Sequence, residues 1–221
     1  MASSWGLSWG DSWGDSWTVT GEVQLVVATF PDIQIRSFRI DLNENKSITE
    51  SLFTRRRQVI SLSNGTADRW EGLLTTPLLQ PVNFRKMMNF LVGTGLHGQF
   101  TIAHPDYDGP VSGEEDGAVD GSGQKGSSLN VRLFTPNTTI LREGEWFQIG
   151  NELKRMTADA TTDGFGDATL NFKPPIRVSP IHGDPVIVES PVLTAELTII
   201  PGEETDSLRM APFTVSFQEA L

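Results

Sequence analysis

The 221-residue chain contains no cysteine and no long apolar run. Without cysteine it can form no disulfide bond and carry out no thiolate chemistry, which fits a protein assembled in a reducing cytoplasm. No run approaches the roughly 18 apolar residues that a membrane-spanning helix needs, so we expect a soluble chain. The first residues, MASSWG, lack the basic start and apolar core of a secretory signal, so we do not expect Sec export.

Basic residues are scarce as well. The chain has 17 lysines and arginines against 28 acidic residues, which gives a net charge of −11 and a pI near 4.7. Binding to phosphate backbones requires Lys and Arg to displace condensed counterions, so this charge argues against specific nucleic-acid binding. Solubility is one explanation of the acidity.

Recognisable catalytic motifs are also missing. The sequence contains no G-x-S-x-G elbow, no P-loop and no H-E-x-x-H. His97, His104 and His182 lie beside Gly or Pro without ligand spacing, which favours loop histidines over a metal site. The acidic residues between Pro105 and Gly123 do not follow EF-hand spacing, which favours a solvated loop. We therefore predict no enzyme, no catalytic residue, no cofactor and no metal.

Short segments with alternating apolar residues occur along most of the chain, as expected of half-buried β-strands. They lie near residues 21–30, 38–42, 59–62, 100–103, 186–188, 195–199 and 213–217. One segment differs, because its apolar residues recur at helical spacing after Pro81, which predicts a helix near residues 81–93. Its apolar face consists of Phe84, Met87, Met88 and Leu91. The predicted class is mainly β.

Between Gly123 and Val178 the apolar runs are short and turn residues separate them. Leu, Val and Leu alternate with polar residues over 129–133, and Gly150-Asn151 predicts a hairpin turn between two further strands. Pro174-Pro175 should close the last strand or lie on an edge, because proline cannot donate to a ladder. Roughly four or five strands in so short a stretch favour an OB-like barrel.

These segments also carry a family resemblance. The succession GQKGSSL, EGEWFQIGNELKRM, a DG turn and LNFKPPIRV resembles the second domain of the distal tail proteins of siphophages. The resemblance continues through RRRQVISLSNGTADRW, the predicted helix, QFTIAH and FTVSFQEAL, and it covers most of the chain. It implies a β-sandwich or barrel-like, ring-forming domain at 18–104 and 185–221, with an inserted OB-like barrel at 105–184.

The resemblance further implies a structural virion protein without enzymatic activity. Its ring would connect the phage tail tube to the baseplate or tip and let DNA pass. The implied partners are further copies in a homo-hexameric ring, the tail tube protein, and baseplate hub or tail-tip and fibre proteins. The protein would be assembled in the host bacterial cytoplasm and located in the virion tail. The acidic composition would then line the channel with carboxylates that repel DNA.

An N-terminal arm, residues 1–17, is one candidate interaction site. It carries a tryptophan at every fourth position among Gly, Ser and Asp, at Trp5, Trp9, Trp13 and Trp17. Four exposed indoles would promote aggregation unless another surface buries them. We therefore interpret the arm as docking on a neighbouring ring component. Two alternatives are a first strand that plugs the chain's own barrel and a sugar-binding surface, since an indole offers an apolar face and a polar N–H.

A second candidate is the run Arg55, Arg56 and Arg57 in this acidic chain. It is either the solvated start of a strand or a contact with carboxylates across a subunit interface, because arginine forks suit carboxylates.

An alternative function comes from a different class. OB-like barrels bind oligosaccharides, so the chain could be a carbohydrate-binding module of the tail tip that attaches to a host-surface glycan. A glycan-degrading tail enzyme is a third hypothesis, although the sequence does not identify a pair of carboxylates that could act as its catalytic residues.

Overall fold

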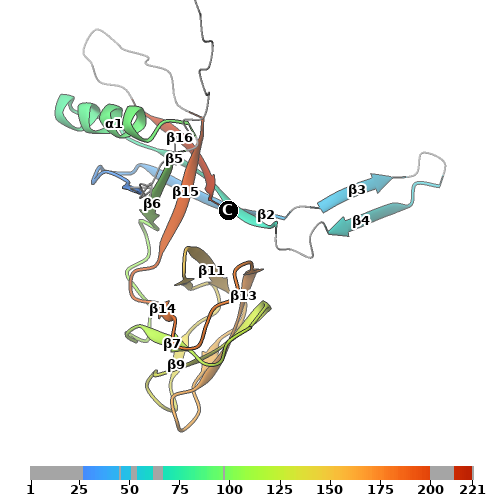
Figure 1. Cartoon of the computed structure of the whole chain (residues 1–221). Coiled ribbons are helices and arrows are strands. Elements are labelled where there is room, and N and C mark those ends of the chain that lie inside the picture. The colour runs from blue at the N-terminus through green and yellow to red at the C-terminus, as the bar shows by residue number, and fades with distance from the viewer. Residues whose placement is uncertain are drawn as a thin grey trace, which may run out of the picture.

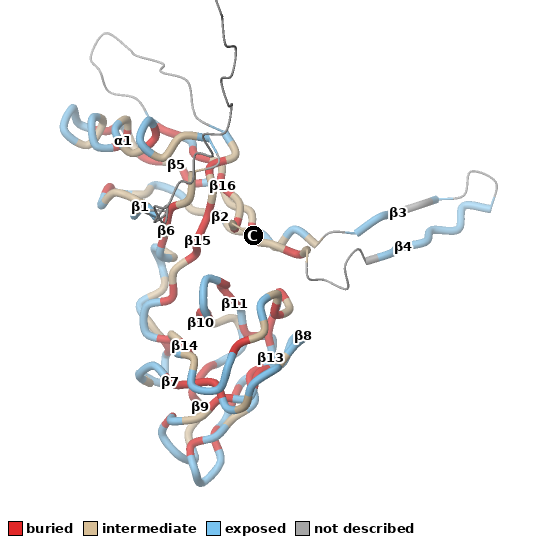
Figure 2. The backbone as a smooth tube through the Cα atoms, viewed as in Figure 1, coloured by how far each residue is buried: buried red, intermediate tan, exposed pale blue. Residues whose placement is uncertain are grey.

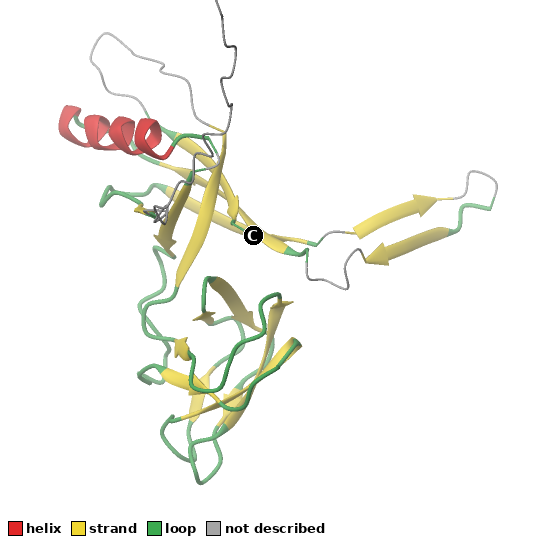
Figure 3. Cartoon of the chain, viewed as in Figure 1, coloured by secondary structure: helices red, strands yellow, loops and turns green. Residues whose placement is uncertain are grey.

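The structure is a computed structural model that describes residues 27–44, 46–50, 54–61, 67–96, 98–199 and 212–220. These residues form an open six-stranded sheet with one helix, a closed barrel and two small two-stranded sheets (Figure 1, Figure 3). The predicted class, mainly β with a helix and a barrel, is confirmed.

The first sheet has the strand order β1-β6-β15-β16-β5-β2. Its strands are β1 (Ala28–Thr29), β2 (Ser37–Asn43), β5 (Arg69–Thr75), β6 (Gln99–Ala103), β15 (Val192–Ile199) and β16 (Thr214–Glu219). Neighbouring strands are antiparallel, apart from the parallel pair β1 and β6. The sheet stays open within the described residues, so β1 and β2 are its edges.

Helix α1 (Pro81–Thr94) packs on this sheet, and the helix predicted near residues 81–93 is confirmed. Met87 and Leu91 are buried in the shared core, and the Phe84 ring lies 5.2 Å from that of Phe213. Gly95, at φ 67°, ends the helix and donates its N–H to the Leu91 carbonyl. The helical period of the sequence therefore corresponds to burial against the sheet.

The barrel closes in the order β10-β11-β13-β8-β7-β14. Its strands are β7 (Gly117–Val119), β8 (Gly126–Arg132), β10 (Trp146–Ile149), β11 (Glu152–Met156), β13 (Ala168–Ile176) and β14 (Pro185–Ile187). The pair β9 (Thr139–Leu141) and β12 (Ala160–Thr161) lies beside it. The predicted turn at Gly150-Asn151 joins β10 to β11 and is confirmed.

Along the chain, the barrel is inserted between two strands that are neighbours in the first sheet. β6 and β15 pair with each other, although every barrel strand falls between them in sequence. The sequence pattern places residues from 185 onward in the first domain, but β14 pairs with β7 and β10, and Val186 is fully buried in the barrel core. The chain therefore leaves the barrel only after Val188, which is still buried in the barrel core.

The barrel has six strands, one more than the OB pattern of about five. β7 was not predicted, because its three residues are too short for a visible alternation. β14 corresponds to the strand predicted near residues 186–188, which was assigned to the first domain. β7 also lies inside the stretch 105–123 that was predicted to be entirely loop.

Two details of the predicted barrel strands are wrong. β8 ends at Arg132, and Leu133 has φ 73° and is 69% exposed, because the backbone turns before its side chain can point inward. Pro174-Pro175 does not close β13, which continues to Ile176. The pairing of β13 with β8 shifts register between Asn171 and Ile176, which accommodates the missing proline donors.

Candidate interaction surfaces

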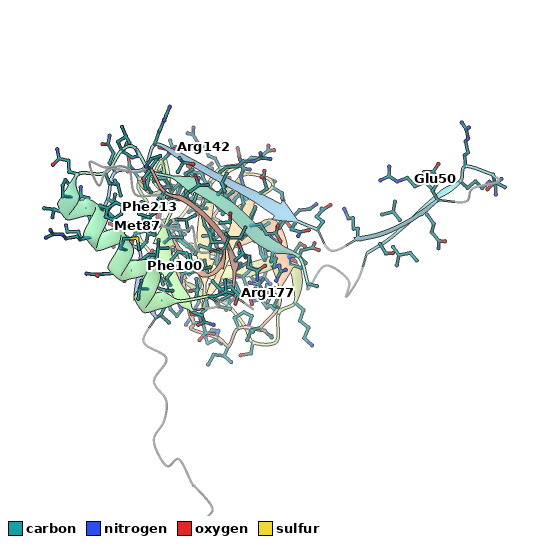
Figure 4. All side chains as sticks on the ribbon, turned by 90° about the horizontal axis from the view of Figure 1, so that it is seen from above. Glu50, Met87, Phe100, Arg142, Arg177 and Phe213 are labelled. Atoms are coloured by element: carbon teal, nitrogen blue, oxygen red, sulfur yellow. The ribbon has the colours of Figure 1, made fainter. Side chains whose placement is uncertain are left out.

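A buried ion pair joins the barrel to the first sheet. The guanidinium of Arg177, just after β13, donates to both carboxylate oxygens of Glu219 in β16, at 3.0 Å and 2.5 Å. The Glu219 side chain is fully buried and also accepts the N–H of Trp70 at 3.2 Å. Figure 4 places Arg177 against the first sheet. Loss of either partner would leave a buried charge, so the pair holds the two parts together.

A second pair lies beside the first. Lys154 Nζ is 2.5 Å from Glu152 Oε2 and 2.9 Å from the Pro175 carbonyl oxygen. Glu152 also accepts the backbone N–H groups of Arg177 and Val178. Burial by itself would raise the pKa of Glu152, but Lys154 and these N–H groups hold it below its usual value. Burial lowers the pKa of Lys154, against the opposing effect of Glu152.

Aromatic side chains fill the rest of this junction. The rings of Trp70 and Trp146 are 4.9 Å apart, and Trp70 Nε1 donates to the Leu153 carbonyl at 2.8 Å. His104 stacks on Trp146, and burial lowers the pKa of its imidazole. Burial also raises the pKa of Tyr107, whose hydroxyl lies 2.9 Å from the Trp146 carbonyl oxygen. These polar groups have structural partners, so the junction orients the barrel.

The hairpin β3–β4, formed by β3 (Lys46–Glu50) and β4 (Arg57–Ser61), extends away from the first sheet (Figure 1). Among the described residues it pairs with no other strand. Figure 2 colours much of it as exposed, and Val59 and Ile60 are 51% and 47% exposed. An isolated two-stranded hairpin is marginally stable in water, so this hairpin is a candidate surface for a partner.

The hairpin is basic in an acidic protein. Between Lys46 and Ser61 four basic residues exceed one acidic residue, so the segment carries +3 and leaves −14 for the rest of the chain. Arg55, Arg56 and Arg57 are all exposed. In the described part of the chain, no ion pair joins them to a carboxylate. The arginine run is thus exposed, which fits both the solvated start of a strand and a contact with carboxylates across an interface.

The base of the hairpin is tied to the barrel through Glu44. Its carboxylate contacts Lys46, the first residue of β3, and lies 3.1 Å from Lys173 Nζ in β13. Hydrogen bonds from Lys46 and then Lys173 lower the pKa of Glu44. Figure 4 shows Glu50 on the hairpin, well away from the core residues Met87, Phe100 and Phe213.

At the other end of the barrel, the loop before β13 presents an exposed aromatic side chain. Phe165 is 88% exposed. Asp163 Oδ1 accepts the N–H groups of Phe165 at 2.8 Å and Asp167 at 3.1 Å, and these N–H groups lower the pKa of Asp163. Gly166 has φ 85°, and a Cβ there would lie 2.3 Å from the Phe134 carbonyl oxygen. The loop therefore has a defined shape that keeps Phe165 in solvent.

A second exposed apolar residue lies close to this loop. Leu133 precedes Phe134, whose N–H donates to the Gly166 carbonyl at 3.3 Å. We define the barrel tip as Phe165 and Leu133 together with the exposed Asp163 and Asp167. A groove of about 500 Å³ continues from the two aspartates along the barrel and is lined mainly by polar side chains.

The described residues provide no metal centre, because no group of three or more His, Asp or Glu side chains could hold an ion. His182 Nδ1 accepts the N–H of Gly121, and His104 belongs to the junction. His97 lies outside the described residues. The helix of the described chain is too short and too polar to cross a membrane.

Comparison with protein-family models and with curated proteins finds no significant match to this chain. Of the predicted interaction residues, the structure places Arg55, Arg56 and Arg57 together at the hairpin. The tryptophans of the N-terminal arm, Trp5, Trp9, Trp13 and Trp17, lie outside the described residues. Sequence inspection missed Phe165, although the DGFGD turn around it was a usable signal. The Arg177–Glu219 pair had no such signal, because its members are far apart in the chain.

Proposed function

We propose that this protein is a structural, non-enzymatic subunit of a ring at the distal end of a siphophage tail. The observation that carries the proposal is the chain order, in which a closed barrel is inserted between β6 and β15, two adjacent strands of an open sheet. The resemblance to distal tail proteins implies this same order. The uncovered hairpin and the open sheet edges support it further, because such surfaces call for partner subunits.

In this role the first sheet would form the ring and the barrel would project from it. The ring would connect the tail tube to the baseplate or tip, and DNA would pass through its channel. The junction around Arg177 and Glu219 supports such a role, because a subunit that connects the tube to the baseplate needs its barrel held in one orientation. The partners would be other copies of the chain, the tail tube protein, and hub or tip proteins.

The virion gives the direct test. Mass spectrometry of purified particles should find this chain in the tail, and particle imaging should show a sixfold ring at the distal end of the tube. Absence of the chain from the virion would overturn the proposal. A purified subunit that remains monomeric would not, because ring assembly can require the tail tube.

A second candidate is a carbohydrate-binding module, and the polar groove beside the barrel tip favours it. Its lining includes Asn130, Thr161, Asp163 and Thr169, which could hydrogen-bond to sugar hydroxyls. A glycan array separates the two functions. The ring subunit is expected to bind no glycan, whereas a specific hit abolished by Asp167→Ala would favour carbohydrate binding.

A further inference from the structure

Helix α1 has an apolar side that the described residues leave uncovered. Met87 and Leu91 face the first sheet, and the opposite side of the helix carries Val82 and Val92. These two valines are 66% and 76% exposed, and Figure 2 colours several turns of α1 as exposed. Apolar side chains gathered on one exposed face mark a binding surface. We define the outer face of α1 as Val82, Arg85, Asn89 and Val92, which are all exposed and share one side of the helix.

A glycine beside this face has no explanation in the packing of the described residues. Gly93 lies within α1, where glycine is among the least favourable residues. A Cβ at Gly93 would meet no atom of another element within 4 Å, so no described neighbour requires the missing side chain. Bare backbone next to an exposed valine lets a flat ring lie close against the helix.

We propose that the outer face of α1 is covered by the tryptophan arm of the same chain, residues 1–17. The arm would lie along the helix with its indoles over Val82 and Val92, which removes apolar surface from water on both sides. This assignment differs from docking on a neighbouring ring component, which the sequence alone favoured. It goes beyond the proposed ring function, because it concerns a contact within the isolated subunit.

The arm is long enough to reach this face. The described chain begins at Val27, close to α1, since the ring of Phe30 lies 5.3 Å from the ring of Phe90 in the helix. Trp17 precedes Val27 by ten positions, which span up to roughly 33 Å of extended chain. α1 has 14 residues and is about 21 Å long. Every part of the outer face is therefore within reach.

The spacing of the tryptophans matches the spacing of the exposed valines. In an extended chain, every fourth residue lies on the same side, at intervals of about 13 Å. Val82 and Val92 are about 15 Å apart along the helix axis. Two consecutive indoles of an extended arm would therefore meet the two valines.

The arm and the helix are also complementary in charge. α1 contains Arg85 and Lys86 and no acidic residue, whereas the arm contains Asp11 and Asp15 and no Lys or Arg. Within the described residues, neither Arg85 nor Lys86 forms an ion pair. Arg85 belongs to the outer face, where its guanidinium can stack on an indole.

Tethering favours the arm of the same chain over the arm of a second copy. A short linker gives the arm an effective concentration on the order of millimolar at its own helix. Two copies, each with a net charge of −11, repel one another at long range. A subunit at micromolar concentration should therefore cover α1 with its own arm.

Cross-linking in the full chain tests where the arm lies. The chain has no cysteine, so introduced cysteines react without background. Ser16→Cys in the arm and Asn89→Cys on the outer face should be joined by a short bismaleimide within monomers, at a rate independent of protein concentration. Ser16→Cys with Lys125→Cys, an exposed position beside β8, is the matched control and should cross-link about tenfold more slowly.

Acrylamide quenching of tryptophan fluorescence measures the cover itself. Trp70 and Trp146 are buried, so changes in quenching report the arm. Val82→Ser with Val92→Ser should lower the docking equilibrium constant about tenfold and raise the quenching, because apolar contacts are lost. Serine and valine have similar helix propensities, so α1 should persist, and circular dichroism checks this.

Two further variants sharpen the quenching experiment. Val111→Ser with Val178→Ser changes two exposed valines near the barrel and should be quenched as the wild type is. Gly93→Ala should favour the helix and nevertheless raise the quenching, because its methyl group occupies the place of an indole. This second variant keeps the test decisive if the serine variant does not fold.

Three results would overturn the proposal. Cross-links found only in dimers would place the arm on a second copy. Equal quenching of the wild type and of both outer-face variants would show that the indoles do not lie on α1. Faster cross-linking with Lys125→Cys than with Asn89→Cys would place the arm on the barrel. None of these outcomes bears on whether the chain is present in virions, so the two proposals fail independently.

Discussion

Arg177 follows a barrel strand, and its guanidinium forms a bidentate ion pair with Glu219 of the first sheet, whose carboxylate is fully buried. Arg177→Ala should lower the free energy of unfolding by about 3 to 5 kcal/mol, because Glu219 would keep a buried, uncompensated charge. Urea denaturation at neutral pH measures this loss.

Two comparisons control this prediction. Arg177→Met combined with Glu219→Leu should cost less than Arg177→Ala alone, because no unpaired charge remains. Arg39→Ala removes the exposed pair with Asp41 and should change stability by about 0 to 1 kcal/mol. An Arg177→Ala protein as stable as Arg39→Ala would show that the buried pair does not hold the barrel to the sheet.

The junction should also weaken in acid through Glu152. Its folded-state pKa lies below the ordinary value of 4.5, so its stabilising contribution is fully present above pH 4.5. That contribution is lost as pH falls through the folded-state value, because the protonated carboxyl no longer attracts Lys154. Urea unfolding from pH 7 to pH 3 should show a smaller loss of stability for Glu152→Gln than for the wild type.

Glu71→Gln is the matched control for the acid series, since its side chain is at the surface of the first sheet. It should follow the wild-type pH dependence. Identical acid profiles for Glu152→Gln and the wild type would argue against this role of Glu152.

The shape of the Phe165 loop should depend on one glycine and tolerate change at another. Gly166→Ala should destabilise the protein by at least about 1 kcal/mol, because φ is 85° and a Cβ would lie 2.3 Å from the Phe134 carbonyl oxygen. Gly164→Ala, in the same loop, meets no atom within 4 Å and should be close to neutral. Thermal unfolding of the two variants compares them, and equal melting temperatures would contradict the prediction.

Removal of the N-terminal arm tests the interpretation of its tryptophans. Deleting residues 2–17 should leave the sheet and the barrel folded and should impair assembly, if the arm docks on a neighbouring component. Circular dichroism and thermal unfolding measure the fold, and sedimentation or incorporation into tails measures assembly. A truncated chain that does not fold would instead indicate that the arm belongs to its own barrel.

Much of the fold was predictable because its signals are local. Phe213, Val215 and Phe217 alternate in the sequence, and they are buried next to and within β16. The strand β7 was not recognised, because three consecutive buried residues show no period. The strand predicted near residues 186–188 was assigned to the first domain, whereas it pairs in the barrel as β14. The candidate surfaces were predictable only in part. The arginine run is visible as a charge pattern, whereas the exposure of Phe165 depends on how its turn packs against Phe134.

The sequence by itself determined the mainly β class, the helix after Pro81 and the hairpin turn at Gly150-Asn151, because periodicity and turn chemistry act between near neighbours. Only the tertiary structure decided that Lys154 and Glu219 are buried and that β14 completes the barrel. It also decided that the basic hairpin is left uncovered by the rest of the described residues. These outcomes depend on pairings between residues far apart in the sequence, whose separation no local pattern encodes.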